Sequence, residues 1–358
     1  MVIIIAYFND KILLISDSLN NINLFRLNHG KIIRHYFDNK METMSKEIVV
    51  ENAFLEYDVS IDTEDNIYLI YQDTSFDLIL IFLKDEEVET IKLTGEPIFE
   101  VYYLNLINID KEFHIFYSIL LKGWERRYRI YHHYFDGRVW ITNIVDEINV
   151  KEILNPLKII NNDKELIIAY YDKMEHEQIY IKSFNLDQKK WGEKIKLTED
   201  ESSKLYVDVL LKEDKLNLVY SQYYEGNLII KYERFSYIDG KVQKEREETL
   251  SNPENAQEPI LIYYDEKLWV VWLEYENVMS RYSDDDGTTW SSIYLWNQSK
   301  EEDIVKYKFY SGYQTDEKML NYSFGKIHPD IKFIGFGSLN STTQIPLKKK
   351  MIFKIPKF

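Results

Sequence analysis

Short runs of mostly apolar residues return along the chain at an almost constant interval. They begin at residues 12, 67, 113, 166, 216, 268 and 319, and read ILLISDS, IYLIYQD, FHIFYSI, LIIAYYD, LNLVYSQ, LWVVWLE and MLNYSFG. These runs are rich in β-branched and aromatic residues, and the apolar positions around them alternate with a period of two. The pattern therefore predicts strands, and no capped amphipathic helix competes with it.

Each run belongs to a larger repeated unit. An extended segment and a polar turn precede it, as in DVSIDTEDNIYLIY at 58–71 and LIYYDEKLWVVW at 261–272. Strand, polar turn and strand form the signature of a β-hairpin, and two more candidate strands follow most copies. Four strands in about 50 residues are typical of a propeller blade. The sequence therefore predicts an all-β fold, a β-propeller of four-stranded antiparallel blades.

The repeat accounts for the whole chain, so residues 1–358 are interpreted as a single β-propeller domain. Seven blades are preferred and six are the alternative, because the last copy is weak. A generic antiparallel sandwich is less consistent with such regular spacing. The predicted blades span about 1–40, 50–95, 100–147, 155–200, 204–250, 257–298 and 304–355.

A local motif lies between the third and fourth predicted strands of the sixth copy. Residues 283–290 read SDDDGTTW, in which Ser283, Asp285, Gly287, Thr289 and Trp290 fit the pattern Ser-x-Asp-x-Gly-x-Thr-Trp. The motif resembles an Asp box, the bacterial neuraminidase (BNR) repeat of sialidases and many other propellers. The resemblance implies a non-catalytic member of the sialidase-like β-propeller superfamily, with the motif as a structural turn away from the ligand site. The carboxylates of 284–286 could alternatively suit Ca²⁺, but the structural turn is favoured and no metal site is predicted.

The catalytic set that the resemblance would imply is not recognisable. A sialidase-like enzyme needs three arginines for the substrate carboxylate, a Tyr nucleophile with a Glu, and an acid or base Asp. Arg26 stands in FRLN, which is similar to the sialidase Phe-Arg-Ile-Pro motif but lacks its Pro, and Arg234 and Arg281 lie in or near third strands. The histidines show no metal-ligand spacing, and His132 and His133 should point to opposite faces of one strand. No catalytic residue and no cofactor are predicted.

A ligand is expected on the face formed by the loops between second and third strands and between consecutive blades. Aromatic platforms beside carboxylates suit sugars or the side chains of a protein partner. The candidate ligand-binding residues are Trp124, Arg126, Tyr171, Asp172, Tyr223, Tyr224, Glu274 and Tyr275. The predicted function is a non-catalytic binding or scaffold propeller that recognises a glycan or a protein. A sialidase-like glycoside hydrolase and a structural assembly protein are the alternatives.

Composition narrows the partners further. The chain has 44 Lys and Arg against 60 Asp and Glu, a formal charge of −16, which disfavours nucleic acids and anionic membrane surfaces. It has no Cys, so disulfides and thiolate metal sites are excluded. The start of the sequence does not have the form of a signal peptide, and no apolar run is long enough to span a bilayer. We therefore expect a cytoplasmic protein without membrane insertion, and the sequence sets no oligomeric state.

Overall fold

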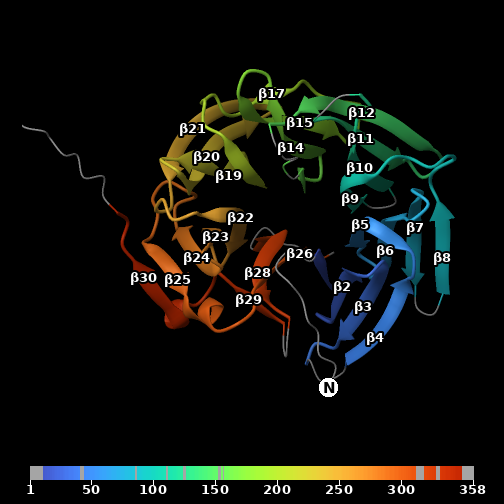
Figure 1. Cartoon of the computed structure of the whole chain (residues 1–358), viewed down its shortest axis with the longest axis horizontal. Coiled ribbons are helices and arrows are strands. Elements are labelled where there is room, and N and C mark those ends of the chain that lie inside the picture. The colour runs from blue at the N-terminus through green and yellow to red at the C-terminus, as the bar shows by residue number, and fades with distance from the viewer. Residues whose placement is uncertain are drawn as a thin grey trace, which may run out of the picture.

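The computed structural model describes residues 11–40, 44–84, 87–109, 112–123, 126–151, 155, 157–311, 318–327 and 331–348. Within these ranges the chain forms strands and two short 3-10 turns, η1 (Asn297–Lys300) and η2 (Leu339–Ser341), and no α-helix. The strands form six sheets arranged around a central axis, as Figure 1 shows. The predicted all-β propeller with four-stranded antiparallel blades is confirmed at this level. No helix in the described part of the chain could cross a membrane.

Four neighbouring sheets follow one plan, in which the first strand lies nearest the axis and later strands lie progressively outward (Figure 1). Numbered in chain order from the sheet of β1, these are the second to fifth sheets, and the sheet of β22 is the sixth. In the fourth sheet the last strand is reduced to the two short pieces β16 and β17, which both pair with β15. The strands are β5 (Ala53–Ile61), β6 (Ile67–Asp73), β7 (Leu78–Lys84) and β8 (Glu87–Lys92); β9 (Val101–Ile109), β10 (Glu112–Leu120), β11 (Arg127–Phe135) and β12 (Trp140–Asn149); β13 (Lys158–Asn161), β14 (Glu165–Lys173), β15 (Glu177–Asn185), β16 (Lys190–Trp191) and β17 (Ile195–Lys196); and β18 (Lys204–Lys212), β19 (Lys215–Tyr224), β20 (Asn227–Ile238) and β21 (Lys241–Thr249).

The two remaining sheets share the C-terminal strands. One contains β1 (Ile12–Ser16), β2 (Ile22–Asn28), β3 (Lys31–Phe37) and β4 (Met44–Val50), extended by β26 (Val305–Ser311), β28 (Tyr322–Lys326) and β29 (Lys332–Ile334). The other contains β22 (Gln257–Tyr264), β23 (Lys267–Glu274), β24 (Asn277–Ser283) and β25 (Ile293–Trp296), with β27 (Lys318–Leu320) and β30 (Thr342–Ile345) at its edges.

In the sheet of β1, the N-terminal strands join the C-terminal strands through β1 and β26. These two strands run parallel, with Ile12 opposite Tyr307, whereas the other strand pairs of the sheet are antiparallel. The strands expected to make a separate last blade are thus divided between two sheets. Residues 1–10 of the first predicted blade and residues 349–355 of the last one lie outside the described residues.

Packing between the sheets closes the ring. Six hydrophobic clusters lie at the six junctions, and each combines buried residues of two neighbouring sheets. In β19, Leu218 packs toward the fourth sheet, whereas Val219, next to it, packs toward the sixth. A strand buried on both faces needs apolar residues at successive positions. This explains why the second strand of each copy is the most visible feature of the sequence.

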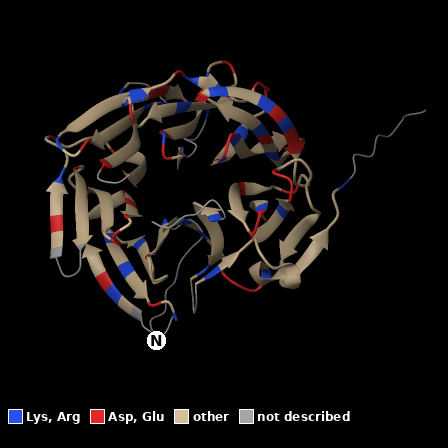
Figure 2. Ribbon diagram, turned by 180° about the vertical axis from the view of Figure 1, so that it is seen from behind, with Lys and Arg blue, Asp and Glu red and all other residues tan. Residues whose placement is uncertain are grey.

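Charged residues lie mainly at the outer edge and around the axis. The outermost strand β21 carries alternating basic and acidic residues, which appear as blue and red bands in Figure 2, and nearly all of its side chains are exposed. Charges on an edge strand oppose edge-to-edge pairing with another chain. The charged residues around the axis differ from those of β21, because they line a central channel and are largely buried.

Candidate ligand site in the central channel

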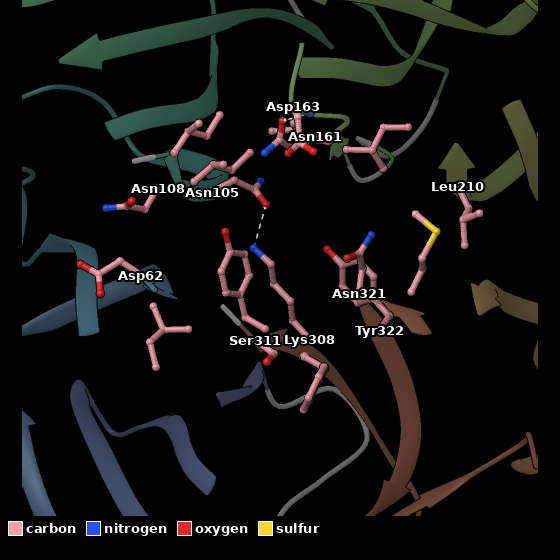
Figure 3. Close-up of a pocket in the computed structure, with 18 of the residues that line it drawn as sticks. Asp62, Asn105, Asn108, Asn161, Asp163, Leu210, Lys308, Ser311, Asn321 and Tyr322 are labelled. Carbon is pink, nitrogen blue, oxygen red and sulfur yellow. Dashed lines mark hydrogen bonds between the residues drawn. The ribbon is translucent and has the colours of Figure 1, made fainter. Parts of the chain in front are cut away.

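A cavity of about 360 Å³ lies in the central channel, between the innermost strands of different sheets (Figure 3). Its apolar wall includes Ile107 on β9, Ile160 on β13 and Leu210 on β18. These side chains come from three sheets, so the closed ring is what brings them together. The cavity lies toward the end of the channel where each innermost strand turns into the second strand, since Asp62 and Asp163 from two such turns also line it.

Lys308 on β26 extends into the middle of the cavity (Figure 3). Its ammonium group donates to Asp58 Oδ2 at 2.7 Å and to Asn105 Oδ1 at 3.3 Å. Asp58 is completely buried, and its Oδ2 also accepts the backbone N–H of Leu106 at 2.7 Å. The only positive charge among the described lining residues is therefore already paired with a fixed carboxylate.

Amide groups supply much of the remaining polarity. Four asparagines line the cavity, namely Asn105, Asn108, Asn161 and Asn321. Asn105 donates to the carbonyl of Tyr103 at 2.8 Å, while the side-chain amides of Asn108 and Asn321 make no hydrogen bond to another described residue. Each amide offers both donors and an acceptor. The lining can therefore exchange hydrogen bonds with a ligand that both donates and accepts.

Two tyrosines and one aspartate at the cavity have well-defined charges at neutral pH. Burial raises the pKa of Tyr310 to about 12 and also raises the pKa of Tyr322, so both phenols remain protonated donors. Burial alone would raise the pKa of Asp62, but hydrogen bonds from Tyr68 and Asn66 outweigh it and hold that pKa below its usual value. Asp62 is therefore an anion at the mouth of the cavity.

Beyond the cavity, further lysine and carboxylate pairs surround the axis. Lys158 Nζ lies 3.8 Å from Asp208 Oδ1 and 3.3 Å from the ring centroid of Tyr322. Burial lowers the pKa of Lys158 and raises the pKa of Asp208. Lys306 likewise pairs with Glu258. The channel is lined by paired charges and carries no large excess of either sign among the residues that the structure describes.

Repeated β-bulges position these innermost side chains. Tyr103, Tyr206 and Glu258 have φ values of 55°, 54° and 54°, and each lies where the pairing of its strand with the second strand shifts register. Two of these bulges have their backbone N–H groups satisfied from outside their own sheet. Glu56 on β5 accepts the Tyr103 N–H at 3.1 Å, and Asn155, in the segment between β12 and β13, accepts the Tyr206 N–H at 3.2 Å. Because their N–H groups bind residues outside their own sheet, these two bulges act as locks between neighbouring sheets. A bulge also changes the direction of nearby side chains, so the bulges shape the channel.

The residues predicted to bind a ligand lie elsewhere. They occupy the ends of second strands and the following loops, at the opposite end of the sheets from the turns at the cavity, and none of those described lines it. Trp124 lies outside the described residues, and the described ones are Arg126, Tyr171, Asp172, Tyr223, Tyr224, Glu274 and Tyr275.

Several of these predicted residues take part in contacts within and between sheets. Tyr171 is buried and donates to the carbonyl of Tyr206. Asp172 is buried, accepts the Asn149 N–H and pairs with Lys194 at 2.5 Å. Arg126 and the tyrosines 223 and 275 are exposed. The exposed residues could reach a partner, and a ligand role for this group remains a prediction.

Glu274, also in this group, is buried. It accepts a hydrogen bond from Trp272 Nε1 at 2.9 Å. Burial nevertheless raises the pKa of Glu274 to about 7.

The SDDDGTTW segment forms a tight turn between β24 and β25. Asp285 accepts hydrogen bonds from the Thr289 N–H at 2.7 Å, the Thr289 hydroxyl at 2.8 Å and the Ser283 hydroxyl at 2.8 Å. The backbone hydrogen bond from Thr289 is the main cause that lowers the pKa of Asp285 to about 2. Gly287 has a φ of +80°, and Trp290 packs edge-on against Tyr232 of the neighbouring sheet, with 4.8 Å between ring centroids.

The arginines considered for a sialidase-like site are dispersed. Arg26, Arg234 and Arg281 lie on β2, β20 and β24, and none lines the cavity. Arg234 donates to the carbonyl of Asp286. Arg281 donates to two backbone carbonyls just before β25 and to that of Leu250, which follows β21. The two latter guanidinium groups therefore hold turns and strand edges in place.

The channel site was not predicted from the sequence, because the residues that form it belong to different copies of the repeat. Asp58, Asn105, Lys158 and Asp208 occupy equivalent positions on the first strands of consecutive sheets, as their pairings with the second strands show. A polar residue at the same place in several otherwise apolar strands was the available signal. It would have indicated the channel, but not which lysine meets which carboxylate.

Comparisons with known proteins find similarity in structure and none in sequence. No protein-family model matches the chain, and no curated protein matches it in sequence. Among solved structures, an ulvan lyase of polysaccharide lyase family PL25 is similar, with a TM-score of 0.57 and 10% identity over 91% of this chain and 94% of that chain. A fucose-recognising Aleuria aurantia lectin, described as a six-bladed β-propeller, gives a TM-score of 0.48 and 11% identity over 80% of this chain and 95% of the lectin. The likeness to the ulvan lyase indicates a shared architecture alone, and none of these comparisons shows membership of the Asp-box superfamily.

Proposed function

We propose that the protein is a non-catalytic glycan-binding propeller that holds a sugar in the channel cavity. The observation that carries the proposal is the combination of four asparagine amides with aliphatic and aromatic walls in one cavity. Sugar hydroxyl groups both donate and accept hydrogen bonds, as amides do, while the C–H faces of a sugar ring pack on apolar surface. The lining matches both properties.

The size of the cavity agrees with a small part of a glycan. Its volume of about 360 Å³ lies at the lower end of the range of roughly 300–1,000 Å³ for small-molecule sites. Asn321 and Tyr322 lie side by side in Figure 3, so one segment presents both an amide and an aromatic ring. A terminal sugar unit suits such a cavity better than the middle of a long polymer.

The exposed loop residues are proposed as a second contact region at the other end of the sheets. Tyr223 and Tyr275 are 48% and 64% exposed, and Arg126 is exposed in the loop between β10 and β11. Exposed tyrosines and arginines are enriched where proteins contact partners. A protein partner would therefore bind here rather than in the channel.

Three finer assignments are also part of the proposal. The hydrogen bonds of Asp285 and the conformation of Gly287 support an Asp box and descent from a sialidase-like propeller. The strands β26, β28 and β29 represent a seventh blade position that has joined the sheet of β1. A cytoplasmic location remains our expectation from the sequence.

A glycan array tests the proposed function, followed by incubation of each bound glycan with the protein. We expect binding without turnover. Release of reducing ends or unsaturated sugars would instead establish a hydrolase or a lyase. Failure of every arrayed glycan to bind the folded protein would contradict the glycan-binding proposal.

A further inference from the structure

We infer that Asp58 determines the ligand class of the channel cavity, which takes uncharged glycans and rejects glycans that carry carboxylate or sulfate groups. The inference rests on the proposed function and names the ligands of the same site. It follows from the ion pair between Asp58 and Lys308, the only cationic residue among the described residues that line the cavity.

Lys308 is the group that would otherwise attract an anion. Its side chain is 17% exposed and reaches the cavity, whereas the Asp58 side chain is 1% exposed. Asp58 cannot turn away, because the same Oδ2 that meets the ammonium group also accepts the Leu106 N–H from the next sheet. An acidic sugar could form an ion pair with Lys308 only by displacing the buried carboxylate of Asp58. Removing one partner from a buried ion pair is strongly unfavourable.

Apart from Lys308, the charged residues that line the cavity are negative. Asp62 and Asp163 line the mouth, and no arginine or histidine is among the described lining residues. A carboxylate or sulfate entering this space would lose its water without gaining an unpaired cation. Desolvation of an uncompensated ion is far more costly than desolvation of a hydroxyl that finds an amide. The lining therefore favours hydroxyl and acetamido groups over acidic ones.

A second buried lysine and aspartate pair with the same arrangement lies outside the cavity. Asp208 occupies the position on β18 that Asp58 occupies on β5, pairs with Lys158, and accepts the Leu261 N–H of the next sheet at 2.8 Å. Neither Asp208 nor Lys158 is among the residues that line the cavity. Replacing Asp208 should therefore disturb a similar buried pair without exposing a cation to the ligand.

The test applies an array of neutral, uronate-bearing, sialylated and sulfated glycans to the wild-type chain, Asp58→Asn and Asp208→Asn. The Asp58→Asn change would keep an oxygen for the Leu106 N–H but leave Lys308 without a counter-charge. We expect the wild type and Asp208→Asn to bind neutral glycans only, and Asp58→Asn to gain at least tenfold in affinity for acidic ones. The double variant Asp58→Asn, Lys308→Gln should lose that gain.

The outcomes separate this inference from the proposed function. Preferential binding of acidic glycans by the wild type, or a folded Asp58→Asn variant without any gain, would overturn the inference and leave glycan binding intact. If no glycan binds, both fail together. If Asp58→Asn does not fold, the salt dependence of the wild type decides. Affinity for the bound glycan that is constant between about 50 and 500 mM salt, to within about twofold, supports the inference, whereas a steep loss contradicts it.

Discussion

His114 Nδ1 and His132 Nε2 lie 3.0 Å apart, and both imidazoles are completely buried between the third and fourth sheets. His132 stacks on Phe116 with 4.4 Å between ring centroids. One ring must donate and the other accept, so the pair requires at least one neutral imidazole. Burial lowers the pKa of His114 to about 4 and that of His132 to about 2, with Glu112 opposing the shift at His114.

These histidines should make the protein sensitive to acid. The unfolded chain takes up protons at an ordinary histidine pKa near 6.5, but the folded chain does not, so their stabilising contribution is complete above about pH 6.5 and is lost as the pH falls toward 4. We expect roughly 2 kcal/mol of stability to be lost per buried histidine between about pH 7.5 and 4.5. Urea denaturation at both values would measure the loss.

A variant assigns that loss to the pair. His132→Phe should cost stability at about pH 7.5, because it breaks the hydrogen bond to His114, yet show a smaller loss on acidification than the wild type. His176→Asn, at an exposed loop position, is the matched control and should keep the wild-type slope. An unchanged slope in His132→Phe would show that other groups cause the acid sensitivity.

Gly287 should be the most sensitive position of the SDDDGTTW turn. Its φ is +80°, and a Cβ there would lie 1.9 Å from the Tyr232 hydroxyl oxygen. We expect Gly287→Ala to destabilise the fold by about 2–4 kcal/mol through strain and overpacking. Gly240→Ala, which also has a positive φ but nothing within 4 Å, should cost only about 1 kcal/mol in the same denaturation experiment. Equal costs would show that the contact with Tyr232 does not matter.

Asp285 should affect the turn but not ligand binding. Because Asp285 is exposed, water can replace part of its hydrogen bonding, and Asp285→Ala should cost about 1 kcal/mol of unfolding free energy. Glycan affinity should stay at the wild-type value in calorimetry. Lost binding with unchanged stability would place the ligand at this turn instead.

The bulge lock between the second and third sheets can be tested by amide exchange. Glu56 accepts the N–H groups of Tyr103 and Leu104, at 3.1 and 3.3 Å, and pairs with Lys11 at 2.6 Å. Glu56→Ala should cost about 2–3 kcal/mol and speed hydrogen exchange at those two amides, because it leaves buried donors without an acceptor. Glu56→Gln, which keeps an acceptor, should lose less. Unaltered exchange in Glu56→Ala would contradict the lock.

The propeller could be predicted from the sequence because its strongest signal is local. In the second strands, residues such as Leu218 and Val219 are buried on opposite faces, so several adjacent positions must be apolar in every copy. The turn at Asp285 was equally accessible, since its hydrogen bonds join residues within four positions of one another. Both the second strands and the turn at Asp285 can therefore be recognised from residues that are close together in the sequence.

The channel was not predictable in this way, because it depends on contacts between distant residues. Lys308 and Asp58 are 250 positions apart, and only closure of the ring brings them together. The parallel pairing of β1 with β26 likewise joins two strands that are far apart in the sequence. Loop position suggested a ligand face at the other end of the sheets, while the cavity depends on side chains of the innermost strands.

Calorimetric titration of an array-selected glycan into Asn321→Ala tests the central claim most directly. If the cavity holds the ligand, loss of one amide contact should weaken binding about tenfold, equivalent to ~1.4 kcal/mol. Asn149→Ala, on the outer strand β12, and Tyr275→Ala, in the loop between β23 and β24, should bind as the wild type does. Full affinity in Asn321→Ala together with lost affinity in Tyr275→Ala would contradict the account and place the glycan on the loop face.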